Sequence, residues 1–302
     1  MTLTMWPFNV DTDLAGVADL IRAAPPNSRH LVDFPWRLSS PASQTQQDMV
    51  LWLGGQGVVG FAAWQIWWAA LDFYVRPGPE QAAVEAAMFQ WAPTRFRELD
   101  TERGHPLPYW AEAREDDAER LSLLARYGYL LDDDYAYIML RRPLDAPVEA
   151  PAPPAGITIR PLAGADEVAA YVAAHRSAFA STSMTADWRA RTLQMPQHRP
   201  ALDLVAVTPG GELAGFCIGW LDDARRLAQV EPLGVVPAHQ GQGIARALLL
   251  TMLQRFQQYG ATHALVETES TRSPARQTYE AVGFRPAYQS IRKGQWFTAP
   301  PG

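Results

Sequence analysis

The chain has 302 residues, of which 48% are hydrophobic and 19% are charged, and its formal net charge is −6. This length and composition allow a substantial buried core and two domains of ordinary size. The acidic balance argues against a nucleic-acid partner, because proteins that bind nucleic acids usually present a basic surface.

Other classes of protein are excluded by what the sequence lacks. Cys217 is the single cysteine, so no internal disulfide can form, and the first residues lack the pattern of a signal peptide. The apolar stretch from Phe61 to Tyr74 is too short for a membrane helix and contains Gln65 and Asp72, so it predicts a pair of core strands. The six histidines show no paired spacing, and we expect no metal. These features predict a cytoplasmic protein without a membrane partner.

The first half of the chain contains a turn, residues 75–81, that leads into a predicted helix from Ala82 to Trp91. Closely spaced prolines follow in residues 143–155, and they disfavour both helix and ladder pairing. We therefore expect a semi-rigid linker there, between domains of residues 1–142 and 156–302.

Hydrophobic patterns and turn residues predict regular elements throughout the second half. The predicted strands are Ile157 to Pro161, Leu204 to Thr208, Ala214 to Leu221, Leu227 to Val236, His263 to Thr268 and Tyr288 to Phe297. The predicted helices are Ala165 to Ala180, Thr185 to Met195, Ile244 to Tyr259 and Ser273 to Ala281.

A glycine-rich turn, Gln240-Gly241-Gln242-Gly243-Ile244-Ala245, joins the predicted strand ending at Val236 to the helix that starts at Ile244. Such a turn leaves backbone N–H groups unpaired at a helix N-terminus, where the helix dipole favours a phosphate. The alternative is that the glycines serve only tight packing.

Two motifs in this half resemble those of the GNAT superfamily of acyl-CoA-dependent N-acetyltransferases. The first is the Gln240-x-x-Gly243-x-Ala245 turn, and the second is Ala275-x-x-x-Tyr279-x-x-x-Gly283-Phe284. The resemblance covers roughly residues 156–297. It implies acetyl-CoA as co-substrate and an α/β (α+β) fold, in which a mixed, mostly antiparallel sheet is flanked by helices.

The two halves of the chain repeat one another. Gly60 and Gly215 lie in similar local sequences, as do Gly128 and Gly283, and both pairs have the same separation along the chain. We infer two tandem GNAT-like domains, an arrangement similar to that of mycothiol synthase.

The first repeat is degenerate by comparison with the second. Its turn contains Pro77 and Pro79, which supply no N–H to a phosphate, and Glu80 would repel an anion. At the shared separation, Leu124 stands where the second repeat has Tyr279, and leucine cannot exchange a proton. We therefore expect one acyl-CoA site, in the second repeat.

The resemblance implies a role for the main chain on both sides of Val236. Pro232 and Gly234 weaken ladder pairing, and in the family this strand separates from its neighbour to admit the pantetheine arm. The alternative is a proline bulge at a sheet edge. The implied pantetheine contacts are Leu233, Gly234 and Val235, and the implied pyrophosphate contacts are Gln240, Gly241, Gln242, Gly243, Ile244, Ala245 and Arg246. Arg272 stands where the family commonly has an asparagine, so it either reaches a phosphate or is solvated.

The predicted chemistry needs a base for the amine and an acid for the departing thiolate. Glu231 is the candidate base, with Glu267 and Glu269 in reserve, and a solvent-facing strand residue is the alternative interpretation. Tyr279 is the candidate acid, because it shares a helix face with Ala275 and Val282 that would point toward the sheet. The alternative is a core tyrosine.

The sequence thus predicts an N-acetyltransferase that acts on a small-molecule amine, as a monomer or homodimer. A non-catalytic acyl-CoA-binding module and an enzyme that acetylates a protein amine are the alternatives.

Overall fold

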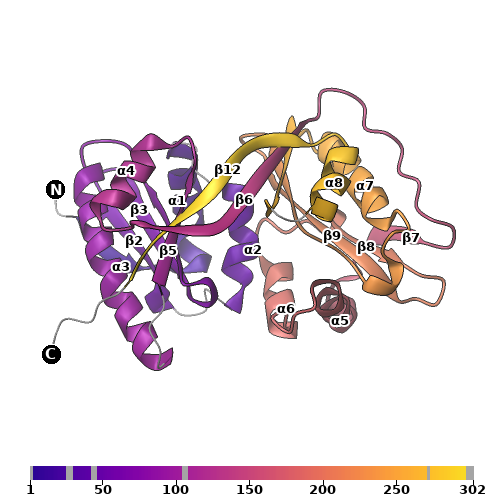
Figure 1. Cartoon of the computed structure of the whole chain (residues 1–302), viewed down its shortest axis with the longest axis horizontal. Coiled ribbons are helices and arrows are strands. Elements are labelled where there is room, and N and C mark those ends of the chain that lie inside the picture. The colour runs from indigo at the N-terminus through magenta and orange to yellow at the C-terminus, as the bar shows by residue number, and fades with distance from the viewer. Residues whose placement is uncertain (1–2, 25–29, 42–45, 104–107, 271–272, 297–302) are drawn as a thin grey trace. The chain divides into compact units, whose positions relative to one another are not determined.

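A computed structural model describes residues 3–24, 30–41, 46–103, 108–270 and 273–296. The chain forms two compact units (Figure 1). The first unit comprises Met1–Leu31, Pro41–Ala136 and Gln289–Gly302, and the second comprises Val32–Ser40 and Tyr137–Tyr288. Each has a mixed, mostly antiparallel sheet with helices packed against it, as predicted.

The first unit has the strand order β1-β2-β3-β4-β5-β12. Strands β4 and β5 pair in parallel, whereas β1 with β2, β2 with β3, β3 with β4 and β5 with β12 are antiparallel. Its strands are β1 (Thr4–Pro7), β2 (Met49–Gly54), β3 (Gly57–Gln65), β4 (Ala70–Val75), β5 (Pro108–Arg114) and part of β12 (Arg285–Trp296), and its helices are α1 (Val10–Ala23), α3 (Gln81–Arg103) and α4 (Ala118–Arg126). The predicted strand pair between Phe61 and Tyr74 corresponds to β3 and β4.

The second unit repeats this pattern in the order β6-β11-β10-β9-β8-β7, with β10 and β11 parallel. Its strands are β7 (Thr158–Pro161), β8 (Asp203–Val207), β9 (Leu213–Asp222), β10 (Leu227–Val235), β11 (His263–Glu269) and part of β6 (Leu131–Pro143). Its helices are α2 (Phe34–Ser39), α5 (Val168–Phe179), α6 (Ala186–Gln194), α7 (Ile244–Gln258) and α8 (Ser273–Ala281).

In each unit, one strand of this order comes from the other repeat of the sequence. Residues Tyr137–Pro143 of β6 pair with β11 in the second unit. Residues Ser290–Trp296 of β12 pair with β5 in the first unit. The units are therefore not simple halves of the chain, and a domain boundary at residues 143–155 stays a prediction.

Helices cover both faces of the second sheet, so its central strands are buried on both sides. Leu204 and Ala206 of β8 pack into the cluster that contains α7, whereas Val205 and Val207 pack against α5 and α6. This two-sided burial fixes α7 against the sheet, and with it the turn that precedes α7.

Gly219 of β9 lets α7 approach the sheet closely. A Cβ atom there would lie 2.4 Å from Met252 Sδ and 2.6 Å from Phe256 Cε1, and both side chains are fully buried. We expect Gly219→Ala to lower the free energy of unfolding by about 1–3 kcal/mol, because a close-packed interior cannot accept the methyl group. Urea unfolding measures the change. Gly210→Ala is the control, since its nearest atom would be 3.7 Å away, and equal stability of the two variants would contradict the packing argument.

Part of the proline-rich segment is packed against the second unit, and its role as a linker between domains stays a prediction. Leu144 and Val148 are buried in the core that contains α7. Gln257 of α7 donates from Nε2 to the carbonyl oxygens of Leu144 (3.1 Å) and Ala146 (2.7 Å). The apolar residues between the prolines therefore hold this part of the segment against the core.

Candidate active site

A cavity of about 680 Å³ lies in the second unit, where the end of β10, the glycine turn, the start of α7 and α8 meet. Ten of the predicted residues line it: Leu233, Gly234, Val235, Gln240, Gly241, Gly243, Ile244, Ala245, Arg246 and Tyr279. The structure therefore brings together both sequence motifs, although they are separated by the whole of α7 and β11.

The turn has the backbone geometry of an anion site. Gly241 and Gly243 have φ values of +73° and +86°, which L-residues with a side chain rarely adopt. Gly243 is the N-cap of α7, and no side chain caps this helix. The N–H groups of the first helical turn are thus available at the positive end of the helix dipole, beside the cavity. A phosphate group fits this arrangement.

Strand β10 leaves its parallel neighbour beside the cavity. It pairs with β11 only from Leu227 to Gln229, although both strands continue beyond that point. Its register with β9 shifts between Val230 and Leu233, where Trp220 Nε1 donates to the carbonyl oxygen of Glu231 at 2.7 Å. Leu233, Gly234 and Val235, which follow this shift, line the cavity.

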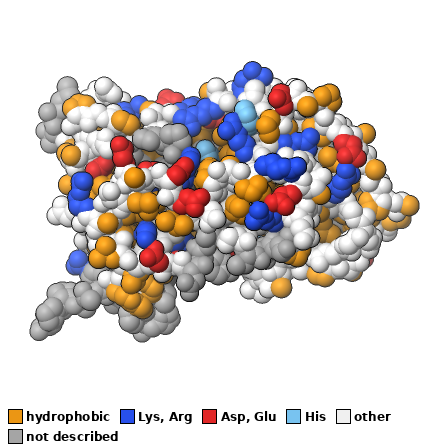
Figure 2. Space-filling model, turned by 45° about the horizontal axis from the view of Figure 1, so that its top comes forward, with side chains coloured by type: hydrophobic (Ala, Val, Ile, Leu, Met, Phe, Trp, Pro, Cys, Tyr) orange, Lys and Arg blue, Asp and Glu red, His pale blue; other side chains and the backbone are white. Residues whose placement is uncertain are grey.

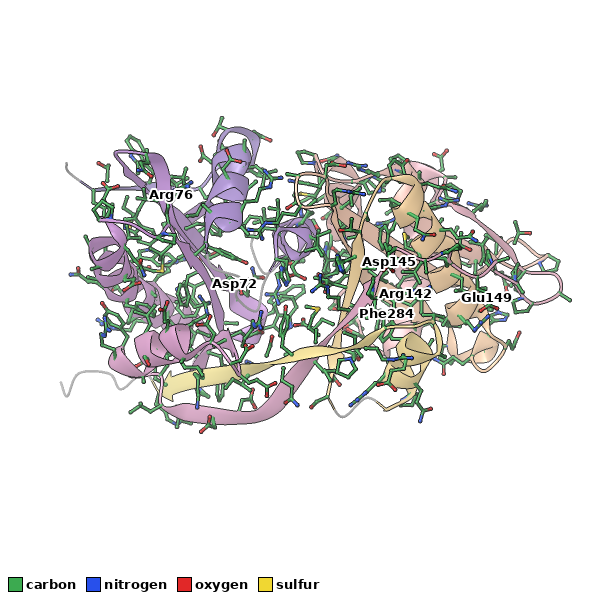
Figure 3. The ribbon with its side chains drawn as sticks, turned by 90° about the horizontal axis from the view of Figure 1, so that it is seen from above. Asp72, Arg76, Arg142, Asp145, Glu149 and Phe284 are labelled. Carbon is green, nitrogen blue, oxygen red and sulfur yellow. The ribbon has the colours of Figure 1, made fainter. Side chains whose placement is uncertain are left out.

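Tyr279 lies on the buried side of helix α8 and lines the cavity. Tyr279 is 8% exposed, its ring centroid lies 6.1 Å from that of Phe284, and Val282 is buried nearby. The guanidinium of Arg142, on β6, donates to the carbonyl oxygen of Val282 just beyond the helix, and Figure 3 labels Arg142 and Phe284. Burial lowers the pKa of Arg142, and the charge of Glu149 acts in the opposite direction. A residue from the first repeat thus secures the helix that carries Tyr279.

The comparisons with known proteins agree with this geometry. The model of the acetyltransferase (GNAT) family matches residues 168–284, which contain both motifs. The chain carries a GNAT acetyltransferase domain.

The chain is also similar to two curated proteins and to one solved structure. Mycothiol acetyltransferase of Salinispora tropica is 31% identical over 191 residues, which cover 59% of this chain and 60% of that protein. The mycothiol acetyltransferase of Streptomyces coelicolor is 26% identical over 281 residues, which cover 89% of this chain and 87% of that protein. A tandem GNAT protein from the clavulanic acid biosynthesis pathway has the same fold, with a TM-score of 0.73, 17% identity and coverage of 99% of this chain and 100% of that one.

Glu231 lies on β10 and is half-buried. It is outside the set of residues that line the 680 Å³ cavity of the second unit. Its Oε2 atom accepts a hydrogen bond of 3.0 Å from Nε2 of Gln229, a fully buried residue. The same Nε2 atom donates to Oδ1 of Asp33, which precedes α2. Sequence reasoning did not find Gln229 or Asp33, because neither belongs to a recognisable motif.

The other predicted residues are placed differently. Gln242 points back to its own loop, where its Nε2 atom donates to the carbonyl oxygen of Ala238 at 3.3 Å. The side chain of Arg246 forms an ion pair of 2.6 Å with Glu149. Glu267 and Glu269 are half-buried on β11, opposite β6. Arg272 lies outside the described residues.

The cavity of the second unit is also lined by residues that the sequence did not predict. Ala178 and Phe179 line it at the end of α5. The ring centroids of Phe179 and His175 lie 4.7 Å apart. His239 is half-buried and also lines the cavity. The remaining lining residues come from α8: Pro274, Ala275, Gln277, Thr278 and Ala281. Hydrophobic periodicity does not identify the exposed positions on α8 as cavity residues, because they face a cavity rather than the core.

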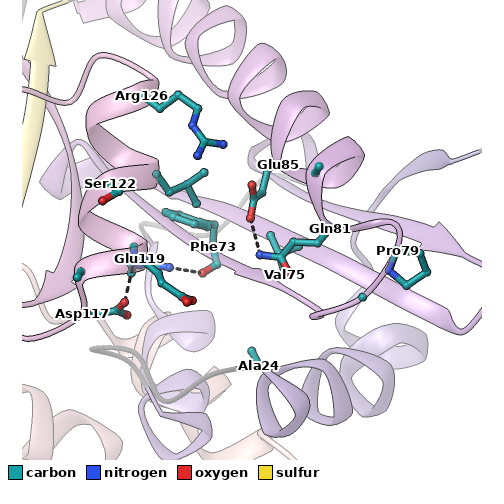
Figure 4. Close-up of a pocket in the computed structure, with 15 residues that line it drawn as sticks. Ala24, Phe73, Val75, Pro79, Gln81, Glu85, Asp117, Glu119, Ser122 and Arg126 are labelled. Carbon is teal, nitrogen blue, oxygen red and sulfur yellow. Dashed lines mark hydrogen bonds between the residues drawn. The ribbon is translucent and has the colours of Figure 1, made fainter.

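The first unit has a cavity of about 760 Å³ at the corresponding place, beside β4, the start of α3 and α4 (Figure 4). Its lining includes the carboxyl groups of Glu85, Asp117 and Glu119. Gln81 Nε2 donates to Glu85 at 2.8 Å, and Leu124 is fully buried. The lining also contains Arg120 and Arg126, so it carries both signs of charge, and the difference in acyl-CoA binding between the repeats stays a prediction.

On the face drawn in Figure 2, acidic and basic side chains are interspersed. Among the described residues, no helix has the length and hydropathy needed to cross a membrane. The described part of the chain also contains no group of three or more His, Cys, Asp or Glu side chains arranged to hold a metal ion.

Proposed function

We propose that this chain transfers the acetyl group of acetyl-CoA to an amine of a small-molecule acceptor, and that it does so in the cytoplasm. The observation that carries the proposal is the single cavity shared by the glycine turn and Tyr279. The turn supplies N–H groups for the pyrophosphate, and the main chain of Leu233 to Val235 lies alongside the pantetheine arm. The mycothiol acetyltransferase relatives support a small-molecule acceptor.

Chemistry starts when the amine nitrogen, after losing a proton, attacks the thioester carbonyl carbon. An alkylamine has a pKa of about 10.4 and is mostly protonated at neutral pH, so a base has to remove that proton. We assign this role to Glu231, acting through water because its carboxylate lies outside the cavity lining. The C–S bond then breaks, and the thiolate takes a proton from the hydroxyl of Tyr279. The nitrogen gives up its second proton, which restores that hydroxyl. The products are an N-acetyl amide and CoA.

The first test concerns the base. Glu231→Gln should keep the shape of the site and remove its proton acceptor, so kcat/KM for the amine should fall and its pH profile should lose the acidic limb. The limb exists because a carboxylate acts as a base only when it is ionised, which requires a pH above its pKa. The release of CoA, measured from pH 5 to 9 with an amine from a broad panel, gives the profile.

The matched controls are Glu267→Gln and Glu269→Gln, which change the reserve carboxylates on β11. An unaltered profile in Glu231→Gln, together with a lost limb in either control, would move the role of base to β11. Affinity for acetyl-CoA, measured by calorimetry, should be the same in all three variants because the proposed contacts are backbone groups.

A further inference from the structure

Gln229 links two carboxylates through one nitrogen atom. Its side chain is fully buried on β10, and Nε2 donates to Glu231 Oε2 at 3.0 Å and to Oδ1 of Asp33. A primary amide has two N–H donors, so these two hydrogen bonds use both of them. The amide therefore has one orientation, and the Glu231 carboxylate is held by one of its oxygens.

Asp33 is itself held firmly, although it comes from a distant part of the sequence. It is 1% exposed and immediately precedes α2, which packs on α6. Ser39 at the end of α2 lies 3.1 Å from Thr192 (Oγ to Oγ1), and its carbonyl oxygen accepts from Arg191 Nε at 2.9 Å. The indoles of Trp36 and Trp188 also pack, with ring centroids 5.0 Å apart. The anchor of Gln229 thus belongs to the second unit.

The remaining polar atom of Gln229 has an unusual environment. Its Oε1 atom is buried and has no hydrogen-bond partner among the described residues. An unsatisfied buried acceptor is destabilising, and such groups in native proteins call for a functional explanation or a bound donor. A methionine of similar size would fill the space without this penalty. The use of glutamine at this position is therefore explained better by its N–H donors than by packing.

We propose that Gln229 is a positioning residue for the base Glu231, and that Asp33 anchors Gln229. This inference rests on the proposed function. The buried chain of hydrogen bonds fixes Glu231 Oε2 and favours the ionised form of that carboxylate, since a donated hydrogen bond stabilises the charged state. The first repeat of the sequence thereby contributes, through Asp33, to the chemistry of the second.

The test compares Gln229→Met, Asp33→Leu and Asp33→Asn with the wild-type chain. Gln229→Met and Asp33→Leu should each lower kcat/KM for the amine about 10-fold or more, because small displacements of a catalytic group are costly. The acidic limb of the Gln229→Met profile should move to higher pH. Asp33→Asn should lose less activity than Asp33→Leu, since its amide oxygen still accepts from Gln229. Calorimetry should give wild-type affinity for acetyl-CoA in each.

A matched control separates positioning from stability. Gln257→Met removes donated hydrogen bonds from α7 to the proline-rich segment, in the same unit but away from Glu231. It should leave the pH profile where it is. The inference is wrong if Gln229→Met retains the wild-type kcat/KM and acidic limb while Glu231→Gln loses them.

A second readout does not require turnover. In protein labelled at its glutamate carboxyl carbons, the NMR resonance of Glu231 can be assigned by its loss in Glu231→Gln. This resonance should titrate at higher pH in Gln229→Met than in the wild type, and coincident titrations would overturn the inference. An absence of turnover with every amine would instead contradict the proposed function and leave this titration as the test of positioning.

Discussion

Replacing Tyr279 by phenylalanine should lower kcat about 10²-fold or more, the usual effect of removing a general acid. The phenol has an ordinary pKa of about 10 and is protonated at neutral pH, whereas the CoA thiolate, with an ordinary thiol pKa of about 8.5, accepts the proton without a large mismatch. Affinity for acetyl-CoA should change little, because the ring keeps its packing against Phe284. Steady-state kinetics with calorimetry on the same sample measure both quantities.

Tyr171→Phe provides the matched control for this substitution. Tyr171 is fully buried in the same unit, it lies outside the cavity lining, and its hydroxyl has no hydrogen-bond partner among the described residues. Loss of that hydroxyl should leave kcat near the wild-type value. A wild-type kcat in Tyr279→Phe, under conditions in which chemistry limits turnover, would reassign Tyr279 to packing.

Gly243→Asp should weaken acetyl-CoA binding by about 10²-fold or more. Two like charges 4 Å apart near a protein surface repel by about 4 kcal/mol, and each 1.4 kcal/mol is a factor of about ten in affinity. The aspartate would also satisfy the helix dipole that otherwise favours the pyrophosphate. Calorimetry should show one acetyl-CoA per wild-type chain and greatly weakened binding in the variant.

Gly211→Asp separates this charge effect from backbone strain. Gly211 has the same φ of +86° as Gly243, and a Cβ atom at either position would meet nothing within 4 Å. Both variants should therefore lose similar stability, while only Gly243→Asp loses affinity. Equal affinities in the two variants, or two equivalent acetyl-CoA sites in the wild type, would exclude the turn as the single phosphate site.

Local patterns in the sequence predicted most elements of the second unit to within three residues. The predicted helix from Ser273 to Ala281 coincides with α8, and the helix predicted from Ile244 is α7. Glycines and prolines mark these boundaries clearly, because they change the backbone angles that are available. In the first unit, the helix predicted to end at Trp91 continues to Arg103 through Pro93, where the tertiary structure tolerates a proline that would ordinarily end a helix.

Interactions between distant segments could not be predicted in the same way. The last predicted strand was expected in the second domain, yet residues Ser290–Trp296 pair with β5 in the first unit. The hydrogen bond between Asp33 and Gln229 joins residues 196 positions apart. Strand pairing and buried polar contacts of this kind depend on complementary surfaces that form only when the chain is folded. Local sequence periodicity therefore does not predict these contacts.

Acetyl transfer to an amine is tested most directly by measuring both products of one reaction. The full chain is incubated with acetyl-CoA and a broad panel of small amines, and free CoA thiol and acetylated amine are quantified by mass spectrometry in the same sample. We expect equimolar CoA and N-acetyl product with at least one amine, and about 10²-fold slower formation of both in Tyr279→Phe. Binding of acetyl-CoA without an acetylated product from any amine would contradict the enzyme and identify a binding module.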